Sequence, residues 1–177
     1  FITADGDYTY TEAFDMYQEQ VRILADAGID LIAAETMINI EETLAAVDAA
    51  SSVCDLPIMC TMTVEADGSI FSGGNAIEAA VSLEAAGADA VGINCSVGPD
   101  QLVSVVRSIK ENVSIPVIAK PNAGMPTIDD KGHAVYSMNA EDFASYMKVL
   151  IESGASVVGG CCGTTPAFIK ALHDNIR

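Results

Sequence analysis

The sequence predicts an α/β fold with a parallel sheet, of the (β/α)8 TIM-barrel type but incomplete, with the last five βα units present. Three similar segments each end a predicted helix at a glycine, Gly28, Gly87 or Gly154, and an apolar stretch follows at once. Two further apolar stretches begin around Pro57 and Pro116, and the interval between these prolines equals the interval from Gly28 to Gly87. Half of that interval is about 30 residues, the length of one βα crossover unit.

Local patterns predict the elements in chain order. A glycine just past a helix can take the left-handed conformation that closes the helix, so a strand is expected directly after each of the three glycines. The five expected strands are 31–34, 56–64, 90–93, 115–120 and 157–158. Apolar residues recur at helical spacing between them, as in Phe143, Met147 and Leu150 after a predicted Asn139 N-cap. Continuously apolar strands separated by helices indicate a covered parallel sheet, and the two-unit repeat favours a barrel over a doubly wound layer.

Composition limits the classes of function. With 177 residues, half of them apolar, the chain is long enough for one core, so we expect a single domain over residues 1–177. A formal net charge of −17 disfavours nucleic acid and anionic membranes as partners. No stretch approaches the roughly 18 apolar residues of a membrane span, and the first residues do not resemble a signal peptide. We therefore expect a cytoplasmic protein whose cysteines are reduced thiols or metal ligands.

Polar and thiol side chains occupy equivalent positions at three predicted strand ends. The residues seven and eight positions past the three glycines are Glu35 and Thr36, Asn94 and Cys95, and Cys161 and Cys162. Because reactive groups of (β/α) barrels project from the C-terminal ends of the strands, these side chains are expected at one rim. Three thiolates bind zinc at roughly 2.3 Å and leave one tetrahedral position for a substrate. The pattern therefore predicts a catalytic zinc site.

Three motifs resemble those of a known family. They are Gly92-Ile93-Asn94-Cys95-Ser96, Ala119-Lys120-Pro121-Asn122-Ala123-Gly124, and Gly159-Gly160-Cys161-Cys162-Gly163-Thr164-Thr165-Pro166. In this order they resemble motifs of the zinc-dependent homocysteine S-methyltransferases, and look most like the homocysteine-binding module of cobalamin-dependent methionine synthase. The resemblance covers essentially the whole chain, but only the last five strands of that family's eight-stranded barrel. It implies that the first three βα units, the N-terminal part of the barrel, are missing here.

The resemblance also implies an activity and a set of site residues. The activity is zinc-dependent methyl transfer to the thiol of homocysteine, giving methionine, with no catalytic group beyond the zinc site. Glu35 would contact the substrate amine, and Asn94 and Thr36 would help to bind the substrate. Asn122 matches an asparagine that can occupy the fourth zinc position without substrate in some members. The implied zinc ligands are Cys95, Cys161 and Cys162.

The expected partners follow from the same resemblance and from the missing strands. Methylcobalamin, presented by another domain or protein, is the implied methyl donor, with betaine and S-methylmethionine as alternatives. The N-terminal barrel part is a second expected partner. Five parallel strands would leave two open sheet edges, which favours a homodimer through those edges.

Other residues leave alternative functions open. Lys120 ends a predicted strand, where Schiff-base lysines stand in aldolases, so a Schiff-base lyase is one alternative. A phosphate-binding barrel that uses the Gly159-Gly160 turn is another, and a truncated zinc-binding fragment without turnover is a third. His133 lies in a long loop that would act as a lid, and is itself expected to be solvated. Cys54 and Cys60 are expected to be packing residues.

Overall fold

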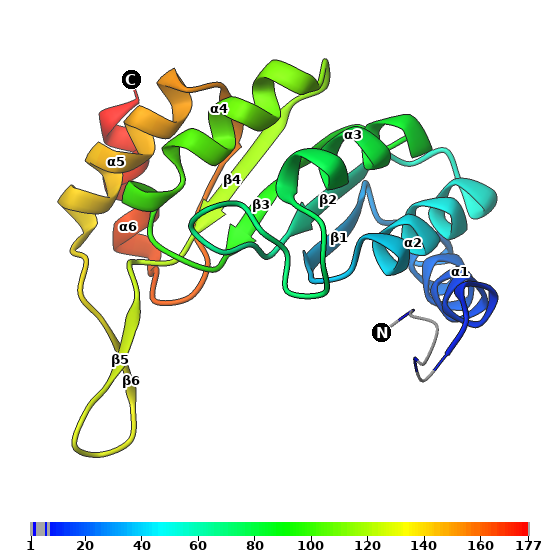
Figure 1. Ribbon diagram of the computed structural model, residues 1–177, viewed down its shortest axis with the longest axis horizontal. Coiled ribbons are helices and arrows are strands. Elements are labelled where there is room, and N and C mark those ends of the chain that lie inside the picture. The colour runs from blue at the N-terminus through cyan, green and yellow to red at the C-terminus, as the bar shows by residue number, and fades with distance from the viewer. Residues whose placement is uncertain (1, 3–5, 7, 177) are drawn as a thin grey trace.

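The computed structural model describes residues 2, 6 and 8–176. Its main sheet has five parallel strands in the order β1-β2-β3-β4-β7, and a helix follows each strand along the chain. The strands are β1 Ile32–Met37, β2 Ile58–Met62, β3 Ala90–Cys95, β4 Val117–Pro121 and β7 Ala155–Val158. The five predicted βα units are confirmed, and Figure 1 shows them following one another around an arc, as in part of a barrel.

Six helices cover the sheet, and each contacts the next along the chain. They are α1 Tyr10–Asp26, α2 Ile40–Val53, α3 Ala76–Ala86, α4 Val103–Asn112, α5 Ala140–Glu152 and α6 Pro166–Asn175, with a short 3-10 turn at Pro99–Gln101. The predicted cap of α5 is confirmed, because the Asn139 side chain accepts a hydrogen bond from the Asp142 N–H at 2.9 Å. Phe143, Met147 and Leu150 on this helix are fully buried in the core.

Glycines follow three of the described helices and precede three of the strands, as the sequence predicts. Gly28, Gly87 and Gly154 all have positive φ, at 80°, 105° and 116°. Gly92 has a different task within β3, because a Cβ built there would lie 2.0 Å from the Ile118 carbonyl oxygen of the neighbouring strand. Only glycine permits that close approach of β3 and β4.

The long loop predicted after the fourth strand instead forms an antiparallel hairpin. Its strands are β5 Pro126–Ile128 and β6 Ala134–Tyr136. The hairpin projects away from the sheet and from the helices that cover it (Figure 1). Most of its side chains are exposed, so no buried apolar face marked these three-residue strands in the sequence.

The two outer strands each pair on one side only within the described part of the chain. Beside β1, a hollow of about 240 Å³ opens between α1, β1 and α2, and apolar side chains dominate its lining, among them Leu24, Leu31 and Ile32. Ile23 on α1 is 64% exposed and Leu31 is 43% exposed. None of the described helices has the length and apolar character needed to cross a membrane.

Candidate metal centre

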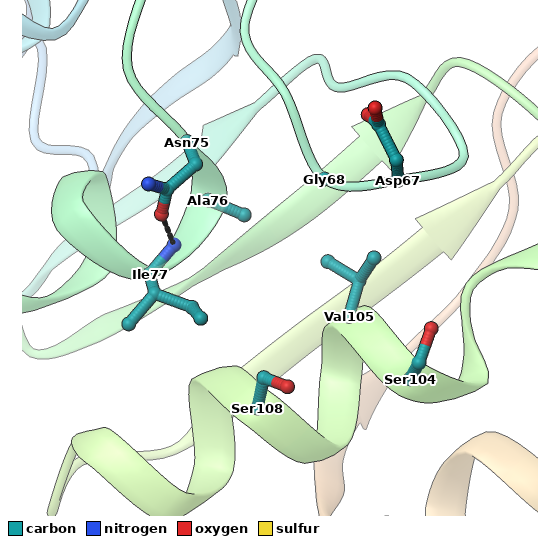
Figure 2. Close-up of a pocket in the computed structure, with 8 residues that line it drawn as sticks. All are labelled: Asp67, Gly68, Asn75, Ala76, Ile77, Ser104, Val105 and Ser108. Atoms are coloured by element: carbon teal, nitrogen blue, oxygen red, sulfur yellow. Dashed lines mark hydrogen bonds between the residues drawn. The ribbon is translucent and has the colours of Figure 1, made fainter.

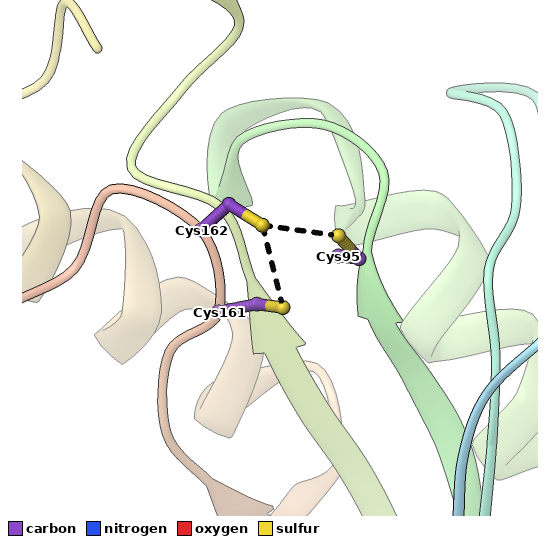
Figure 3. A group of neighbouring side chains, drawn as sticks. All are labelled: Cys95, Cys161 and Cys162. Carbon is purple, nitrogen blue, oxygen red and sulfur yellow. Dashed lines mark hydrogen bonds between the residues drawn. The ribbon is translucent and has the colours of Figure 1, made fainter. Parts of the chain in front are cut away.

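Three thiols from two distant segments meet at the C-terminal rim of the sheet. The Cys95 Sγ lies 3.5 Å from the Cys162 Sγ, and the Cys161 Sγ lies 4.0 Å from the Cys162 Sγ. All three sulfurs lie within 4.8 Å of one another. Figure 3 shows the three side chains pointing into the same space from β3 and from the loop after β7.

The spacing of these sulfurs fits a zinc ion. Ligands bound at roughly 2.3 Å with tetrahedral angles are separated from one another by about 3.8 Å. The observed separations of 3.5 Å and 4.0 Å lie on either side of that value. Three soft sulfur ligands also match the preference of zinc over magnesium or calcium. Cys95, Cys161 and Cys162 are therefore the residues that could hold the metal.

Burial and the neighbouring thiols affect the protonation of Cys95. Burial, followed by hydrogen bonds with the Cys162 and Cys161 side chains, raises the pKa of Cys95 to about 12. Among these groups alone, the protonated thiol is favoured, because a thiolate there is poorly solvated and faces two further sulfurs. A divalent cation among the sulfurs reverses this preference, since it attracts thiolates.

The backbone turns sharply at two equivalent strand ends. Thr36 at the end of β1 and Cys95 at the end of β3 both have a φ of 62°, and Ser96 has a φ of 67°. A side chain in this left-handed region costs roughly 1–2 kcal/mol. Thr36 and Cys95 are also the residues eight positions past Gly28 and Gly87. The structural repeat therefore extends to the local backbone conformation.

Asn94 joins these two strand ends. Its Oδ1 accepts a hydrogen bond from the Thr36 N–H at 3.0 Å, and its Nδ2 donates to the Thr36 Oγ1 at 2.8 Å. The same Nδ2 lies 3.7 Å from the Cys161 Sγ, within hydrogen-bonding range of sulfur. Because Asn94 is only 1% exposed, it is a rigid link between β1, β3 and the cysteine loop.

Asn122 joins the two segments that carry the cysteines. Its Nδ2 donates to the Ser96 carbonyl at 3.0 Å, and its Oδ1 accepts from the Cys162 N–H at 3.0 Å. Both ends of this buried carboxamide are thus engaged beside the thiols. The neighbouring Ala123 adds a backbone link, since its N–H donates to the Cys162 carbonyl at 2.9 Å and its carbonyl accepts from the Met138 N–H at 3.2 Å.

The loop after β7 stays attached to β4 although its regular strand ends at Val158. The Gly159 N–H donates to the Ala119 carbonyl at 3.2 Å, and the Cys161 N–H donates to the Pro121 carbonyl at 2.8 Å. A Cβ built at Gly160 would lie 2.5 Å from the Thr164 side chain, so the turn requires glycine there. Hydrogen bonds to β4 therefore hold the loop that carries Cys161 and Cys162.

Glu35 and Lys120 form an ion pair at the same rim. Glu35 lies on β1, directly before Thr36, and Lys120 lies on β4, in register with Asn94. The Lys120 side chain is 22% exposed and the Glu35 side chain 43% exposed. The Lys120 Nζ is thus engaged by the Glu35 carboxylate, whereas a Schiff-base lysine must be free to attack a carbonyl carbon.

Tyr136 is a site residue that the sequence interpretation missed. It ends the hairpin strand β6, and its ring lies against Gly163 so closely that a Cβ there would be 2.3 Å from a ring carbon. Desolvation, followed by the neighbouring Cys162 thiol, raises the pKa of Tyr136. No motif or spacing linked Tyr136 to the cysteines, because the contact depends on the path of the hairpin.

The remaining candidates lie away from the thiols. His133 is in the hairpin turn, exposed, with its Nδ1 3.4 Å from an Asp129 carboxylate oxygen. Cys60 is fully buried in β2, where burial raises its pKa to about 12, and Cys54 follows α2 as its C-cap. These positions agree with solvated and packing roles.

A second hollow, of about 350 Å³, lies between the loop after β2 and the helices α3 and α4 (Figure 2). Its polar groups are partly engaged in local structure, since the Asn75 Oδ1 accepts from the Ile77 N–H and the Asp67 Oδ1 accepts from the Ser69 N–H. No cysteine, histidine, lysine or arginine is among the described residues that line it. This hollow therefore lacks the thiol and lysine side chains that lie at the rim with the three cysteines.

Comparison with known proteins gives consistent matches. Methionine synthase of Mycobacterium tuberculosis is 34% identical over 173 residues, which are 94% of this chain and 14% of that protein. Homocysteine S-methyltransferase 3 of Zea mays is 35% identical over 181 residues, with 97% of this chain and 53% of the maize protein covered. The chain thus spans about half of the maize relative and a small part of the mycobacterial one.

Solved structures show the same fold. The homocysteine methyltransferase MmuM of Escherichia coli in its apo form superposes with a TM-score of 0.78 at 23% identity, over 98% of this chain and 60% of that chain. Its metallated form has the same TM-score and identity. The family model for homocysteine S-methyltransferase matches residues 2–176. The chain belongs to the homocysteine S-methyltransferase family.

Proposed function

We propose that this chain is part of a zinc-dependent enzyme that transfers a methyl group to the thiol of homocysteine and so forms methionine. The observation that carries the proposal is the convergence of Cys95, Cys161 and Cys162 at zinc-ligand spacing in a chain of this family. In the reaction, the homocysteine sulfur forms a bond to the methyl carbon while the bond between that carbon and the donor breaks. The thiol proton is released to solvent, and the bonding electron pair leaves with the donor.

The side chains around the thiols have separate tasks in this proposal. When zinc is bound, its positive charge favours loss of the substrate thiol proton. Three cysteine thiolates rather than neutral histidines keep the local charge negative, which suits a sulfur that must attack a methyl group. Asn94 and Asn122 hold the cysteine segments in place through the hydrogen bonds described above. Glu35 and Thr36 bind the substrate at the end of β1.

We propose that the enzyme needs protein outside residues 1–177. The chain spans 53% of the maize relative and 14% of the mycobacterial methionine synthase, and the apolar hollow beside β1 is exposed here. A further part of the barrel beside β1 would cover that surface. Methylcobalamin on another domain is the proposed donor, and betaine and S-methylmethionine are the alternatives. Alternatively, a homodimer that forms through the open strand edges would cover this surface, and sedimentation equilibrium would detect it.

The first experiment measures zinc and methyl transfer in the same preparations. The protein at its natural length is purified anaerobically, its zinc content is measured by mass spectrometry, and isotopically labelled methyl donors are offered together with homocysteine. We expect one zinc per chain and labelled methionine. The matched variants are Cys95→Ser and Cys54→Ser, because both exchange a thiol for a hydroxyl and only the first lies in the cluster. Equal zinc content in both variants would contradict the proposed metal site.

A further inference from the structure

We propose that Lys120 binds the carboxylate of the amino-acid substrate, and that the Lys120–Glu35 ion pair opens as the substrate enters. The substrate ammonium then pairs with Glu35 and its carboxylate pairs with Lys120. The inference rests on the proposed function, because it takes an amino-acid thiol as the substrate. It assigns to Lys120 a role in specificity that is separate from the metal.

The first supporting observation is that the ion pair crosses the barrel mouth. Two strands, β2 and β3, separate β1 from β4 in the sheet. In a flat sheet, three strand spacings would separate β1, which carries Glu35, from β4, which carries Lys120, by about 14 Å. The two side chains meet because the sheet curves, so their contact lies across its concave face.

The second observation is the closeness of this pair to the thiols. Lys120 is the register partner of Asn94, so both side chains leave the sheet on the same face. The Asn94 amide lies 3.7 Å from the Cys161 Sγ. A Cβ built at Gly159 would lie 3.3 Å from the Lys120 Cγ, so the lysine stem runs past the start of the cysteine loop. A substrate with its sulfur at the thiols would therefore have its charged end beside this ion pair.

The third observation is the position of Lys120 relative to the other cations. Among the described residues it is the one lysine or arginine on a strand of the main sheet. The others lie on the outer helices or in the hairpin turn, and they are Arg22, Arg107, Lys110, Lys131, Lys148 and Lys170. Among the described residues, Lys120 is thus the cationic side chain that the main sheet itself offers to a carboxylate at the barrel mouth.

Charge balance explains why the pair is closed before the substrate enters. The Lys120 side chain is only 22% exposed, and the more exposed Glu35 carboxylate gives its ammonium a partner of opposite charge. A zwitterion brings one charge of each sign, so the exchange replaces one ion pair with two and leaves the net charge of the mouth unchanged. A thiol that lacks either charged group would leave Glu35 or Lys120 without a partner. The site therefore selects amino-acid thiols over simple thiols.

The test combines variants with substrate analogues in the zinc-loaded protein at its natural length. Lys120→Met is expected to raise the KM for homocysteine about 10- to 100-fold, the range for a lost charge-assisted contact. For 3-aminopropane-1-thiol, which has no carboxylate, the same variant is expected to change KM less than about threefold. Glu35→Gln should show the mirror result, with a large loss for homocysteine and little for 4-mercaptobutanoate, which has no ammonium. Lys120→Arg should recover most of the affinity.

Controls separate this inference from the proposed function. Lys148→Met makes the same exchange on an exposed face of α5 and should leave both KM values unchanged. Calorimetric titration with each thiol reports binding without turnover. If the protein transfers no methyl group but Lys120→Met weakens homocysteine binding selectively, the carboxylate site is supported and the methyl transfer is rejected. Methyl transfer by the wild type, with Lys120→Met affecting both thiols equally or neither, would overturn the carboxylate site alone.

Discussion

The ends of β1 and β3 have the same backbone and different chemistry. Thr36 and Cys95 each lie eight positions past a helix-closing glycine, and each has a φ of 62°. One position carries a hydroxyl that is hydrogen-bonded to Asn94, and the other carries a thiol of the three-cysteine cluster. The repeated βα unit therefore determines where a side chain projects, whereas the residue type determines what that position does.

The end of β7 shows the limit of this equivalence. Its regular strand stops at Val158, and Cys161 and Cys162 lie on the loop beyond it. Hydrogen bonds to Pro121, Asn122 and Ala123 hold that loop in place. Position at a strand end can therefore be fixed either by the repeat or by contacts from the adjacent strand.

Thr36 and Cys95 should differ most in what their replacement does to zinc binding. Cys95→Ser should weaken zinc binding by more than about 100-fold, since loss of a residue that only supports a ligand already costs about 10- to 100-fold. Thr36→Ser keeps its hydroxyl and should leave zinc affinity unchanged. Competition with a chromogenic chelator measures both variants. Comparable zinc affinities in the two proteins would refute the division of tasks between β1 and β3.

The next effect concerns the link between the two strand ends. Asn94→Leu removes both hydrogen bonds to Thr36 and leaves the Thr36 N–H without its partner, so we expect a loss of about 3 kcal/mol in the free energy of unfolding. Thr36→Val removes only the hydroxyl contact and should cost about 1 kcal/mol. Urea denaturation of both variants gives the difference. Similar losses in the two proteins would mean that the backbone contact contributes nothing.

A smaller effect tests the glycines that set the register. Gly28 and Gly87 have φ values of 80° and 105°, and a Cβ at either position would have no neighbour closer than 4.0 Å. Gly28→Ala and Gly87→Ala should therefore each lose about 1 kcal/mol of stability from backbone strain alone. Gly163→Ala starts from the same φ as Gly28 but collides with Tyr136, so it should lose more. If thermal unfolding shows the same loss of stability for Gly163→Ala as for the other two variants, that result would argue against the contact with Tyr136.

A further set of variants tests the left-handed conformation of Thr36 directly. At this position Thr36→Gly should be more stable than Thr36→Ala by about 1 kcal/mol, because glycine adopts a positive φ without a Cβ clash. On the same strand, Ala33→Gly should show the usual order and lose about 0.5–1 kcal/mol. Urea denaturation of the three variants measures both differences. An alanine variant as stable as the glycine variant would show that Thr36 is not strained.

The fold was largely predictable from sequence because its signals are local. A glycine after a helical pattern marks a helix end wherever it occurs, and Gly28, Gly87 and Gly154 marked three of them. An exposed strand of three residues gives no such signal, so the hairpin containing Tyr136 was missed.

The site was predictable in its location and not in its contacts. Counting from the glycines placed Asn94 and Cys95 at the rim, but the left-handed backbone at Cys95 has no signature in the sequence. The pairing of Glu35 with Lys120 depends on the curvature of the whole sheet. The two hydrogen bonds of Asn122 depend on how two distant loops approach each other.

Ala123 makes the hairpin a replaceable insert. Its N–H is joined to the Cys162 carbonyl and its own carbonyl to the Met138 N–H, so the chain leaves and returns at a single anchored residue. Tyr136 packs against Gly163 beside the cysteine loop, so the exchangeable part is the segment between Gly124 and Val135. Such a segment can be lengthened, shortened or exchanged without pulling on the sulfurs, which gives this scaffold a place to change what approaches the rim while Cys95, Cys161 and Cys162 stay where they are.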